Sequence, residues 1–299
     1  MKTILTLSDF SQSAEQALNR AVLLARRHDA VLELAQLSGT GPPDSAERLQ
    51  RCAAMLARRH RLRVRCLGAL DGEARLREAA AARADLLVLG WPAAGPRDWL
   101  LGGPLPRRLL RRQPCPLLVV RQPAEQAYHR LLVTVNLAPP AAALRLVEAA
   151  AALAPEAQLE LFHAIGTRDE ARLRAAEASY RSVLAYREAL YRHARQHLLQ
   201  LSDSLGARRN RLMYTLGRGD PACQALVQQE YGGAELIVVG KPRRAAWAEL
   251  LLGSTAARLL GRARCDLLIW PEANAAGAAS ANIAAAGAPP TPGSRTMGA

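Results

Sequence analysis

The feature of this sequence that most constrains its fold is an internal repeat. The segment AVLELAQLSGT at residues 30–40 is matched by AQLELFHAIGT at residues 157–167, a displacement of 127 positions. Further along, ADLLVLGWP at 84–92 is matched by AELIVVGKP at 234–242, and the displacement has grown to 150 positions. A repeat is considered first because it determines the architecture. The sequence therefore predicts two copies of one domain within 299 residues, the second enlarged by an insertion of 23 residues.

Each copy alternates short apolar runs with helical patterns. The runs are rich in Leu, Val and Ile without polar alternation, which is typical of strands buried on both faces of a parallel sheet. Five strands are expected per copy, at 3–8, 30–37, 62–67, 85–90 and 117–120 in the first and at 131–135, 158–164, 211–216, 235–240 and 267–270 in the second. The predicted fold class is α/β, with two tandem doubly wound, Rossmann-like domains, each built on a five-stranded parallel sheet.

The domain limits follow from the repeat. We assign residues 1–122 to the first domain, 123–129 to a linker and 130–272 to the second domain. The segment 273–299 is rich in Ala, Gly, Pro and Ser, and we expect a disordered tail. The insertion, at about 168–206, has helical periodicity and no proline. It predicts one or two long helices that cover the strand ends of the second domain.

The charge and the cysteines limit the classes of partner. A formal charge of +14 suggests nucleic acid or an acidic partner, but nearly every cation is an arginine and the arginines are scattered along the chain. A solvated basic surface is therefore the favoured interpretation, and nucleic-acid binding is the disfavoured one. No C-x-x-C pair occurs, so we interpret the cysteines as small core residues: Cys52, Cys66, Cys115, Cys223 and Cys265. The absence of an apolar run of about 18 residues and of a signal-peptide pattern predicts no membrane span and a cytoplasmic location.

Several segments together resemble the universal stress protein family, from Lys2 to about Pro271. They are SDFSQSAEQAL after the first strand, the two fourth-strand segments ADLLVLG and AELIVVG, LGRGDPAC at 216–223, and LLLGSTAARLLGRARCDLLIW near the end. The chain is similar to the tandem, E-type bacterial members, whose fold is of the adenine-nucleotide α-hydrolase type. The resemblance implies that the two domains form an intramolecular pseudo-dimer, and the absence of a catalytic motif predicts a non-enzymatic protein. We predict pairing through strands 117–120 and 267–270, whose apolar edges need cover.

The resemblance also implies a nucleotide site in each domain. Family members that bind ATP use an Asp after the first strand and a loop G-x-x-G-x9-G-[S/T] after the fourth. The first domain keeps Asp9, Gly90 and Gly103, but Ala93 replaces the second glycine and Pro104 replaces the hydroxyl residue. Because proline has no amide hydrogen to donate, we expect this loop to be inactive toward phosphate.

The second domain departs from the same pattern at other positions. Gly240 opens its loop, and Gly253 and Ser254 close it ahead of a helix, but Arg243 occupies the middle glycine position and Asn136 replaces the Asp. Glycine amides, a helix N-terminus and a hydroxyl suit phosphate oxygens. Any ATP or related nucleotide should therefore bind here, and weakly; a degenerate, empty pocket is the alternative. Positive charge beside a phosphate would come from Lys241, Arg243 and Arg244.

Other side chains suggest sites with less support. His193 and His197 share one helix face and could ligate a metal, but no third ligand is evident nearby. Tyr180 and Tyr191 of the insertion could form a wall against a ligand or partner, or simply pack. His163 is interpreted as structural. Since no catalytic motif is found, the leading hypothesis is a stress-response scaffold that binds an unknown small molecule; an ATP-dependent switch and a basic interaction protein are its rivals.

Overall fold

The computed structural model describes residues 1–299 except 41, 93–102, 113–114, 206–210, 243–254 and 273–299. Parts of both expected nucleotide loops, including Ala93, Arg243, Arg244, Gly253 and Ser254, therefore lie outside the described residues, as does the expected disordered tail. Within the described part of the chain, no helix is both long enough and apolar enough to cross a membrane.

The first domain alternates strands and helices. Its elements are β1 (Thr3–Leu7), α1 (Gln12–His28), β2 (Val31–Leu37), α2 (Ser45–His60), β3 (Val64–Leu70), α3 (Gly72–Arg83), β4 (Leu86–Gly90), α5 (Leu105–Leu110) and β5 (Leu117–Val120). The largest departure from the expected strands is β3, which starts and ends later. It starts later because the N–H of Leu62 still bonds to Ala57 of α2. It ends later because a bulge leaves Leu67 out of the pairing with β2.

The second domain repeats this order with one helix more in the described residues. Its elements are β6 (Arg130–Thr134), α6 (Pro140–Leu153), β7 (Gln158–Ile165), α7 (Arg168–Ala175), α8 (Tyr180–Asp203), β8 (Leu212–Arg218), α9 (Pro221–Gly232), β9 (Leu236–Pro242), α11 (Thr255–Arg262) and β10 (Asp266–Glu272). Strands β9 and β10 stay paired as far as Pro242 and Glu272, beyond the expected ends.

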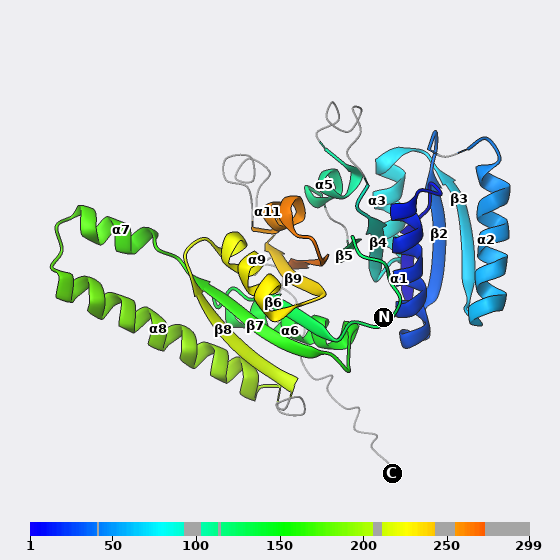
Figure 1. Ribbon diagram of the computed structural model, residues 1–299. Helices are drawn as coiled ribbons and strands as arrows, with labels where there is room; N and C mark the ends of the chain where they lie inside the picture. Colours follow the sequence, from blue (N-terminus) through cyan, green and yellow to red (C-terminus); the bar gives the residue numbers. More distant parts are fainter. Residues whose placement is uncertain (41, 93–102, 113–114, 206–210, 243–254, 273–299) are drawn as a thin grey trace, which may run out of the picture.

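All ten strands form one sheet in the order β3-β2-β1-β4-β5-β10-β9-β6-β7-β8 (Figure 1). Within each half every pair is parallel, and the halves meet where β5 and β10 pair antiparallel, with Leu118 opposite Leu268. The predicted fold class and the predicted pairing of the terminal strands are confirmed. The two five-stranded sheets are joined into one because each apolar terminal strand covers the open edge of the other.

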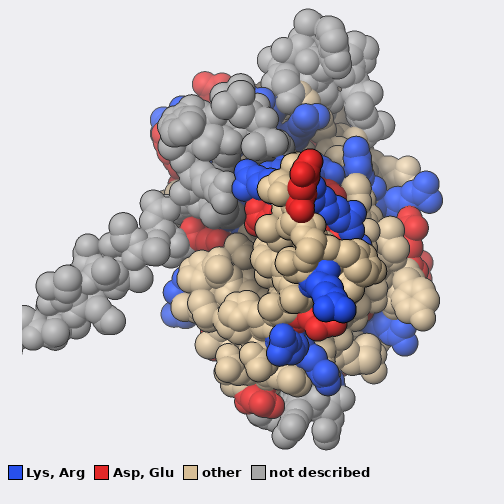
Figure 2. Space-filling model, turned by 90° about the vertical axis from the view of Figure 1, so that its left-hand side faces the viewer, with Lys and Arg blue, Asp and Glu red and all other residues tan. Residues whose placement is uncertain are grey.

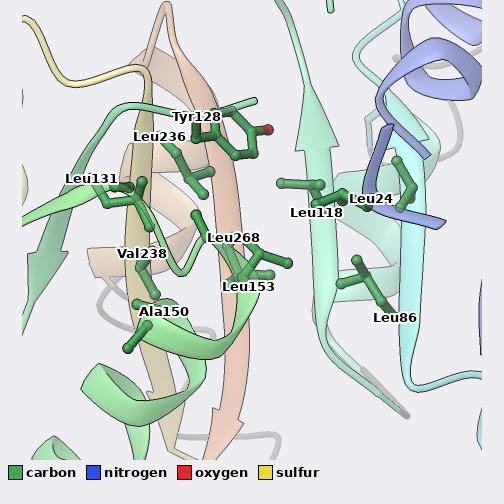
Figure 3. Packing of buried hydrophobic residues seen from close by; sticks show 14 of the residues in the cluster. Leu24, Leu86, Leu118, Tyr128, Leu131, Ala150, Leu153, Leu236, Val238 and Leu268 are labelled. Atoms are coloured by element: carbon green, nitrogen blue, oxygen red, sulfur yellow. The ribbon is translucent and has the colours of Figure 1, made fainter. Parts of the chain in front are cut away.

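The core consists of one layer on each face of the sheet, and both layers span the two domains. Along β5, Leu118 and Val120 belong to the layer under α1 and α6, whereas Leu117 and Val119 belong to the opposite layer. Figure 3 shows the first layer at the junction, with Leu118 between Leu24 of α1 and Leu268 of β10. The two copies therefore share a hydrophobic core.

The insertion forms α7 and α8. Helix α8 packs on β7 and β8 at the place that α2 takes in the first copy, with Ala194, Leu198 and the side of Tyr191 in the core. Most of it lies along the sheet face, so the expectation that it covers the strand ends was wrong for most of this helix. Tyr180 is 75% exposed and does not form a wall with Tyr191. Beyond its first turns, helix α8 packs on the sheet face and not over the strand ends because it occupies the position of a sheet-covering helix in this fold.

Helix α7 and the first turns of α8 lie past the carboxyl ends of the outer strands (Figure 1). The carboxylate of Glu170 in α7 is buried and accepts hydrogen bonds from Arg174 at 2.8 Å, from Arg187 of α8 at 2.6 Å and from Arg218 at the end of β8. The bonds from Arg187 and then Arg218 lower the pKa of Glu170 to about 2. Figure 2 faces the α7–α8 end of the molecule and shows basic and acidic side chains interspersed there.

The cysteines are free, and only some of them are core residues. Cys115 and Cys265 are buried, and Cys52 and Cys223 are partly buried. Cys66 is exposed, so its interpretation as a core residue was wrong. It lies on β3, an edge strand of the sheet, where nothing beyond the strand covers it.

A buried aspartate joins the two domains and the expected linker. Asp266 begins β10 and is fully buried; its carboxylate accepts hydrogen bonds from the Tyr128 hydroxyl at 2.6 Å and from the N–H groups of Arg121 and Gln122 at 2.8 and 3.1 Å. Arg20 of α1 lies 3.5 Å from the same carboxylate and stacks on the Tyr128 ring at 3.8 Å. The linker is therefore anchored in the interface rather than free.

We predict that Asp266→Asn destabilises the protein by about 3 kcal/mol, because it leaves the buried Arg20 guanidinium without its counter-charge. Urea denaturation at pH 7 measures the change. The matched control is Asp29→Asn, which removes the carboxylate of an exposed pair with Arg63 and should change stability by less than about 1 kcal/mol. Equal effects of the two substitutions would show that the buried network contributes no more to stability than an exposed ion pair.

Candidate functional site

A cavity lies where the strand order reverses in the first domain. The connections from β1 and β4 leave toward opposite faces of the sheet, and such a switch point opens a crevice at the carboxyl ends of the two strands. The cavity has a volume of about 240 Å³. Its walls come from the ends of β1 and β4 and the first turns of α1 and α5. The polar groups and backbone that line it include Ser8, Asp9, Ser11, Ser13, Thr40 and Gly90.

The turn between β1 and α1 presents Asp9 to the cavity. One carboxylate oxygen of Asp9 accepts the N–H of Ser11 at 2.9 Å, while the Ser11 hydroxyl accepts the N–H of Ala14 at 3.2 Å and so caps α1. Phe10 between them has a φ of 63°, the left-handed conformation that this tight turn requires. The other carboxylate oxygen of Asp9 has no protein partner among the described residues. It is free to accept a hydrogen bond from a ligand.

Gly90 is needed for packing as well as for any ligand. A Cβ atom at this position would lie 2.1 Å from the carbonyl oxygen of Ser13, so only glycine lets the end of β4 approach the first turn of α1. Both Gly90 and Ser13 line the cavity. The close approach therefore fixes the width of the crevice between β4 and α1.

The start of α5 has few donors for a phosphate. Pro104 precedes the helix and Pro106 is in its first turn, and neither has an amide hydrogen. The N–H groups of Arg107 and Arg108 both bond to the Pro104 carbonyl. Of the amides in this turn, Leu105 alone is left without a partner in the described part of the chain. The start of α5 therefore offers few amide donors, and the inactivity of the first-domain loop toward phosphate stays a prediction.

The charge of the cavity is set by Asp9. Arg108 also lines it, but this guanidinium pairs with Glu73 of α3 and donates to the Gly103 carbonyl at 2.9 Å. Asp9 forms no ion pair with any described residue. The lining is therefore one unbalanced carboxylate with several hydroxyl groups and apolar walls, which favours a ligand that donates hydrogen bonds and disfavours an anion.

The corresponding turn of the second domain keeps one hydrogen bond but not the backbone conformation, because Leu137 lacks the positive φ of Phe10. The amide oxygen of Asn136, after β6, accepts the N–H of Ala138 at 3.3 Å, as Asp9 accepts the N–H of Ser11. Gly240 lies in β9 opposite Trp270, and a Cβ atom there would lie 2.1 Å from a carboxylate oxygen of Glu272. Asn136 thus stabilises its own turn, whereas the contact at Gly240 is with the end of a flexible side chain and does not by itself require glycine. Because Arg243, Gly253 and Ser254 lie outside the described residues, nucleotide binding by this loop stays a prediction.

Lys241 is not available to the second-domain site. Its side chain is buried, and the ammonium group donates to the carbonyl of Leu110, the last residue of α5 in the other domain. The expectation that Lys241 adds charge beside a phosphate was therefore wrong. Its charge instead satisfies the carbonyl end of the helix whose first turn lines the first-domain cavity.

Arg121 makes the reciprocal contact. It follows β5 of the first domain, and its guanidinium donates to the carbonyl of Leu260 in α11 of the second domain and stacks on the Trp91 ring at 4.1 Å. Burial lowers the pKa of Arg121, and the nearby Cys265 and Asp266 oppose that shift. The helix after each nucleotide-type loop is thus tied at its carboxyl end to a cation of the opposite domain.

The segment LGRGDPAC is structural in the second domain. Asp220 accepts the N–H of Cys223 at 2.9 Å and so caps α9, and it also pairs with both nitrogens of the Arg258 fork in α11. The bond from Arg258 is the main reason that the pKa of Asp220 falls to about 2. Arg108, 150 positions before Arg258, pairs with Glu73 of α3. In both copies this arginine connects the helices on one face of the sheet.

The histidines have no visible role in chemistry. A ring nitrogen of His163 lies 2.9 Å from the Val135 carbonyl, and burial lowers the pKa of this imidazole, in keeping with a structural residue. The rings of His193 and His197 lie 4.2 Å apart. Within the described ranges, no three His, Cys, Asp or Glu side chains come together as a metal site would require.

The universal stress protein family model matches residues 1–121 and 127–271. This chain belongs to the universal stress protein family. A universal stress protein from Archaeoglobus fulgidus is similar in structure, with 15% identity, a TM-score of 0.66 and 91% of this chain matched to 98% of that one. A functionally unknown protein from Pseudomonas aeruginosa has 20% identity and a TM-score of 0.68 over 91% and 93% of the two chains. At these identities the likeness shows the fold alone, and the comparison with curated proteins gives no match.

We predict that Asp220→Asn lowers stability at pH 7 by about 1 kcal/mol, because asparagine caps a helix as well as aspartate does but cannot pair with Arg258. The folded pKa of Asp220 lies below its ordinary value of 3.8. The stabilisation is therefore present above about pH 4 and is lost as the pH falls toward 2.

Urea denaturation of the wild type and of Asp220→Asn between pH 7 and 3 tests this prediction. The stability difference should shrink as the pH approaches 3. Arg258→Gln should have the same effect, and the double variant should add little to either single one. A difference that stays constant down to pH 3 would mean that the ion pair is not its source.

Proposed function

We propose that the chain is a non-enzymatic ligand-binding scaffold of the stress response, and that the first-domain cavity is its main ligand site. The observation that carries the proposal is the Asp9 carboxylate, which lines a cavity of about 240 Å³ and, among the described residues, has one oxygen without a partner and no ion pair. The sequence favoured the second domain instead, because its loop keeps more of the phosphate-binding pattern. A cavity can bind a ligand without a phosphate site.

The lining indicates the class of ligand. Hydroxyls of Ser11 and Ser13 lie 3.1 Å apart beside Asp9, and the apolar walls include Leu37 and Leu89. Such a site suits a small neutral or cationic molecule with hydrogen-bond donors and one apolar face. A nucleoside without phosphate has these properties.

The same groups support a binding role rather than catalysis. The described lining contains no histidine, cysteine or lysine. Its serine hydroxyls bond to one another and to backbone amides, and none has a general base positioned to activate it.

We expect adenosine, used as a neutral probe, to bind more tightly than ATP at the first domain. Asp9→Ala should weaken adenosine binding at least tenfold, which corresponds to about 1.4 kcal/mol for a lost hydrogen bond to a charged acceptor. Titration calorimetry measures both affinities. The control is Asn136→Ala at the matched position of the second domain, which should leave adenosine binding unchanged; the opposite pattern would place the site in the second domain.

A nucleotide-binding switch in the second domain is the second candidate function, and the Gly253-Ser254 pair favours it. We expect ATP binding there to be weak or undetectable, because Asn136 lacks the negative charge of the usual Asp. Ser254→Ala should weaken any binding by about 1–3 kcal/mol, and Gly253→Pro should abolish it. Calorimetry on the same variants is the measurement, and tight ATP binding that survives Gly253→Pro would contradict this assignment.

A further inference from the structure

Arginines that are scattered along the sequence gather at one edge of the fold. Arg26 and Arg27 lie in the last turn of α1, and Arg58 and Arg59 lie in the last turn of α2. Arg61 follows as the C-cap of α2. All five are exposed. Both helices end where the parallel strands begin, at the edge of the sheet opposite the cavity (Figure 1).

Contacts show that these charges lie close together. Arg63 donates to the carbonyl and carboxylate oxygens of Asp29, the C-cap of α1, at 2.7 and 3.2 Å. Burial lowers the pKa of His60, and the charges of Arg59 and Arg26 lower it further, so guanidinium groups from both helices act on one imidazole.

The cluster continues into the second domain through Glu156. Its carboxylate accepts from Arg27 at 2.9 Å and from Arg211, just before β8, at 2.8 Å. We name the seven arginines at these helix ends and beside them the basic edge: Arg26, Arg27, Arg58, Arg59, Arg61, Arg63 and Arg211.

The positive charge of the basic edge is largely unbalanced. Two carboxylates, Asp29 and Glu156, pair with Arg27, Arg63 and Arg211. The other members, Arg26, Arg58, Arg59 and Arg61, form no ion pair with any carboxylate in the described part of the chain. Exposed guanidinium groups without partners are available to an external anion.

Helix stabilisation does not account for the cluster. Cations at a helix C-terminus are favourable, so two arginines in each last turn could serve the helices alone. However, α6 and α8, which occupy the matching places in the second copy, have no basic residue in their last turns. Arg63 and Arg211 also lie outside the α-helices. The two copies have the same fold, and six of the seven arginines belong to the first of them.

We propose that the basic edge binds the phosphate backbone of duplex DNA. Guanidinium groups suit phosphate oxygens, and several unbalanced ones at one edge give the electrostatic footprint of a sequence-independent contact. No aromatic residue belongs to the cluster, so stacking on unpaired bases is not favoured. A membrane surface would call for apolar side chains to insert beside the charges. Met55 and Met213 are exposed near members of the basic edge in the sequence, so anionic vesicles are included in the test as the competing polyanion.

The test is anisotropy of a labelled 20-base-pair duplex with the full chain at several salt concentrations. We expect binding at low salt and a slope of log K against log salt of about −3, for three to four neutralised phosphates. The variant Arg58→Gln/Arg59→Gln/Arg61→Asn should weaken binding at least tenfold and flatten the slope. Asn is used at 61 because that residue has a positive φ.

The matched control is Arg181→Gln/Arg192→Gln/Arg195→Gln on α8, which removes the same charge from exposed residues on a face where acids and bases are interspersed (Figure 2). It should change affinity less than twofold. Circular dichroism checks that both variants fold. DNA should also raise the pKa of His60, measured by NMR, because phosphate offsets the charges of Arg59 and Arg26.

Several results would overturn the proposal. Equal loss of binding in the two triple variants would mean that net charge alone attracts the duplex. No binding at low salt would show that the basic edge is not a DNA-binding site. Equal affinity for polyglutamate or for vesicles of anionic lipid would assign the basic edge to another class of polyanion.

Discussion

The antiparallel pairing of β5 with β10 is the contact on which the rest of the structure depends. Without it, each five-stranded half would end in an apolar edge strand open to association. With it, Leu118 meets Leu268 in one layer of the core while Val119 meets Leu267 in the other. Asp266, at the start of β10, holds Arg20 and Tyr128 in the same junction, so the chain between the copies is fixed by the strands that it connects.

The junction is built from positions at which the two copies differ. Asp266 corresponds to Pro116 in the first copy, and Lys241 corresponds to Trp91. A pair of identical domains would present each of these residues twice, whereas the fused chain uses each of them on one side of the junction. As a consequence, α5 beside the first-domain cavity depends on a lysine of the second domain, and α11 depends on Arg121 of the first.

The sequence was sufficient for the features that rest on local pattern. Apolar runs and the repeat predicted the strands, and the need to cover Leu117–Val120 predicted the junction. The pattern could not reveal Asp266 as a buried residue with several partners, because those partners are 138 to 246 positions away and a lone aspartate resembles a surface residue. The prediction for Lys241 failed for a similar reason, because no sequence pattern marks the backbone carbonyl of Leu110 as its partner. The first-domain cavity was not predicted, because a glycine-loop motif indicates donors for a phosphate and does not indicate whether the fold leaves a cavity.

Helix α1 relates the two candidate surfaces to each other. Ser11 and Ser13 at its start line the cavity, whereas Arg26 and Arg27 at its end belong to the basic edge. Its 17 residues rise through about 25 Å. A ligand in the cavity therefore cannot touch an anion on the basic edge, and any influence between them has to pass through the position of the helix. Because Ala17, Ala21 and Ala25 of α1 are fully buried against the sheet, that position is held by the core. The packing thus favours two sites that are occupied independently.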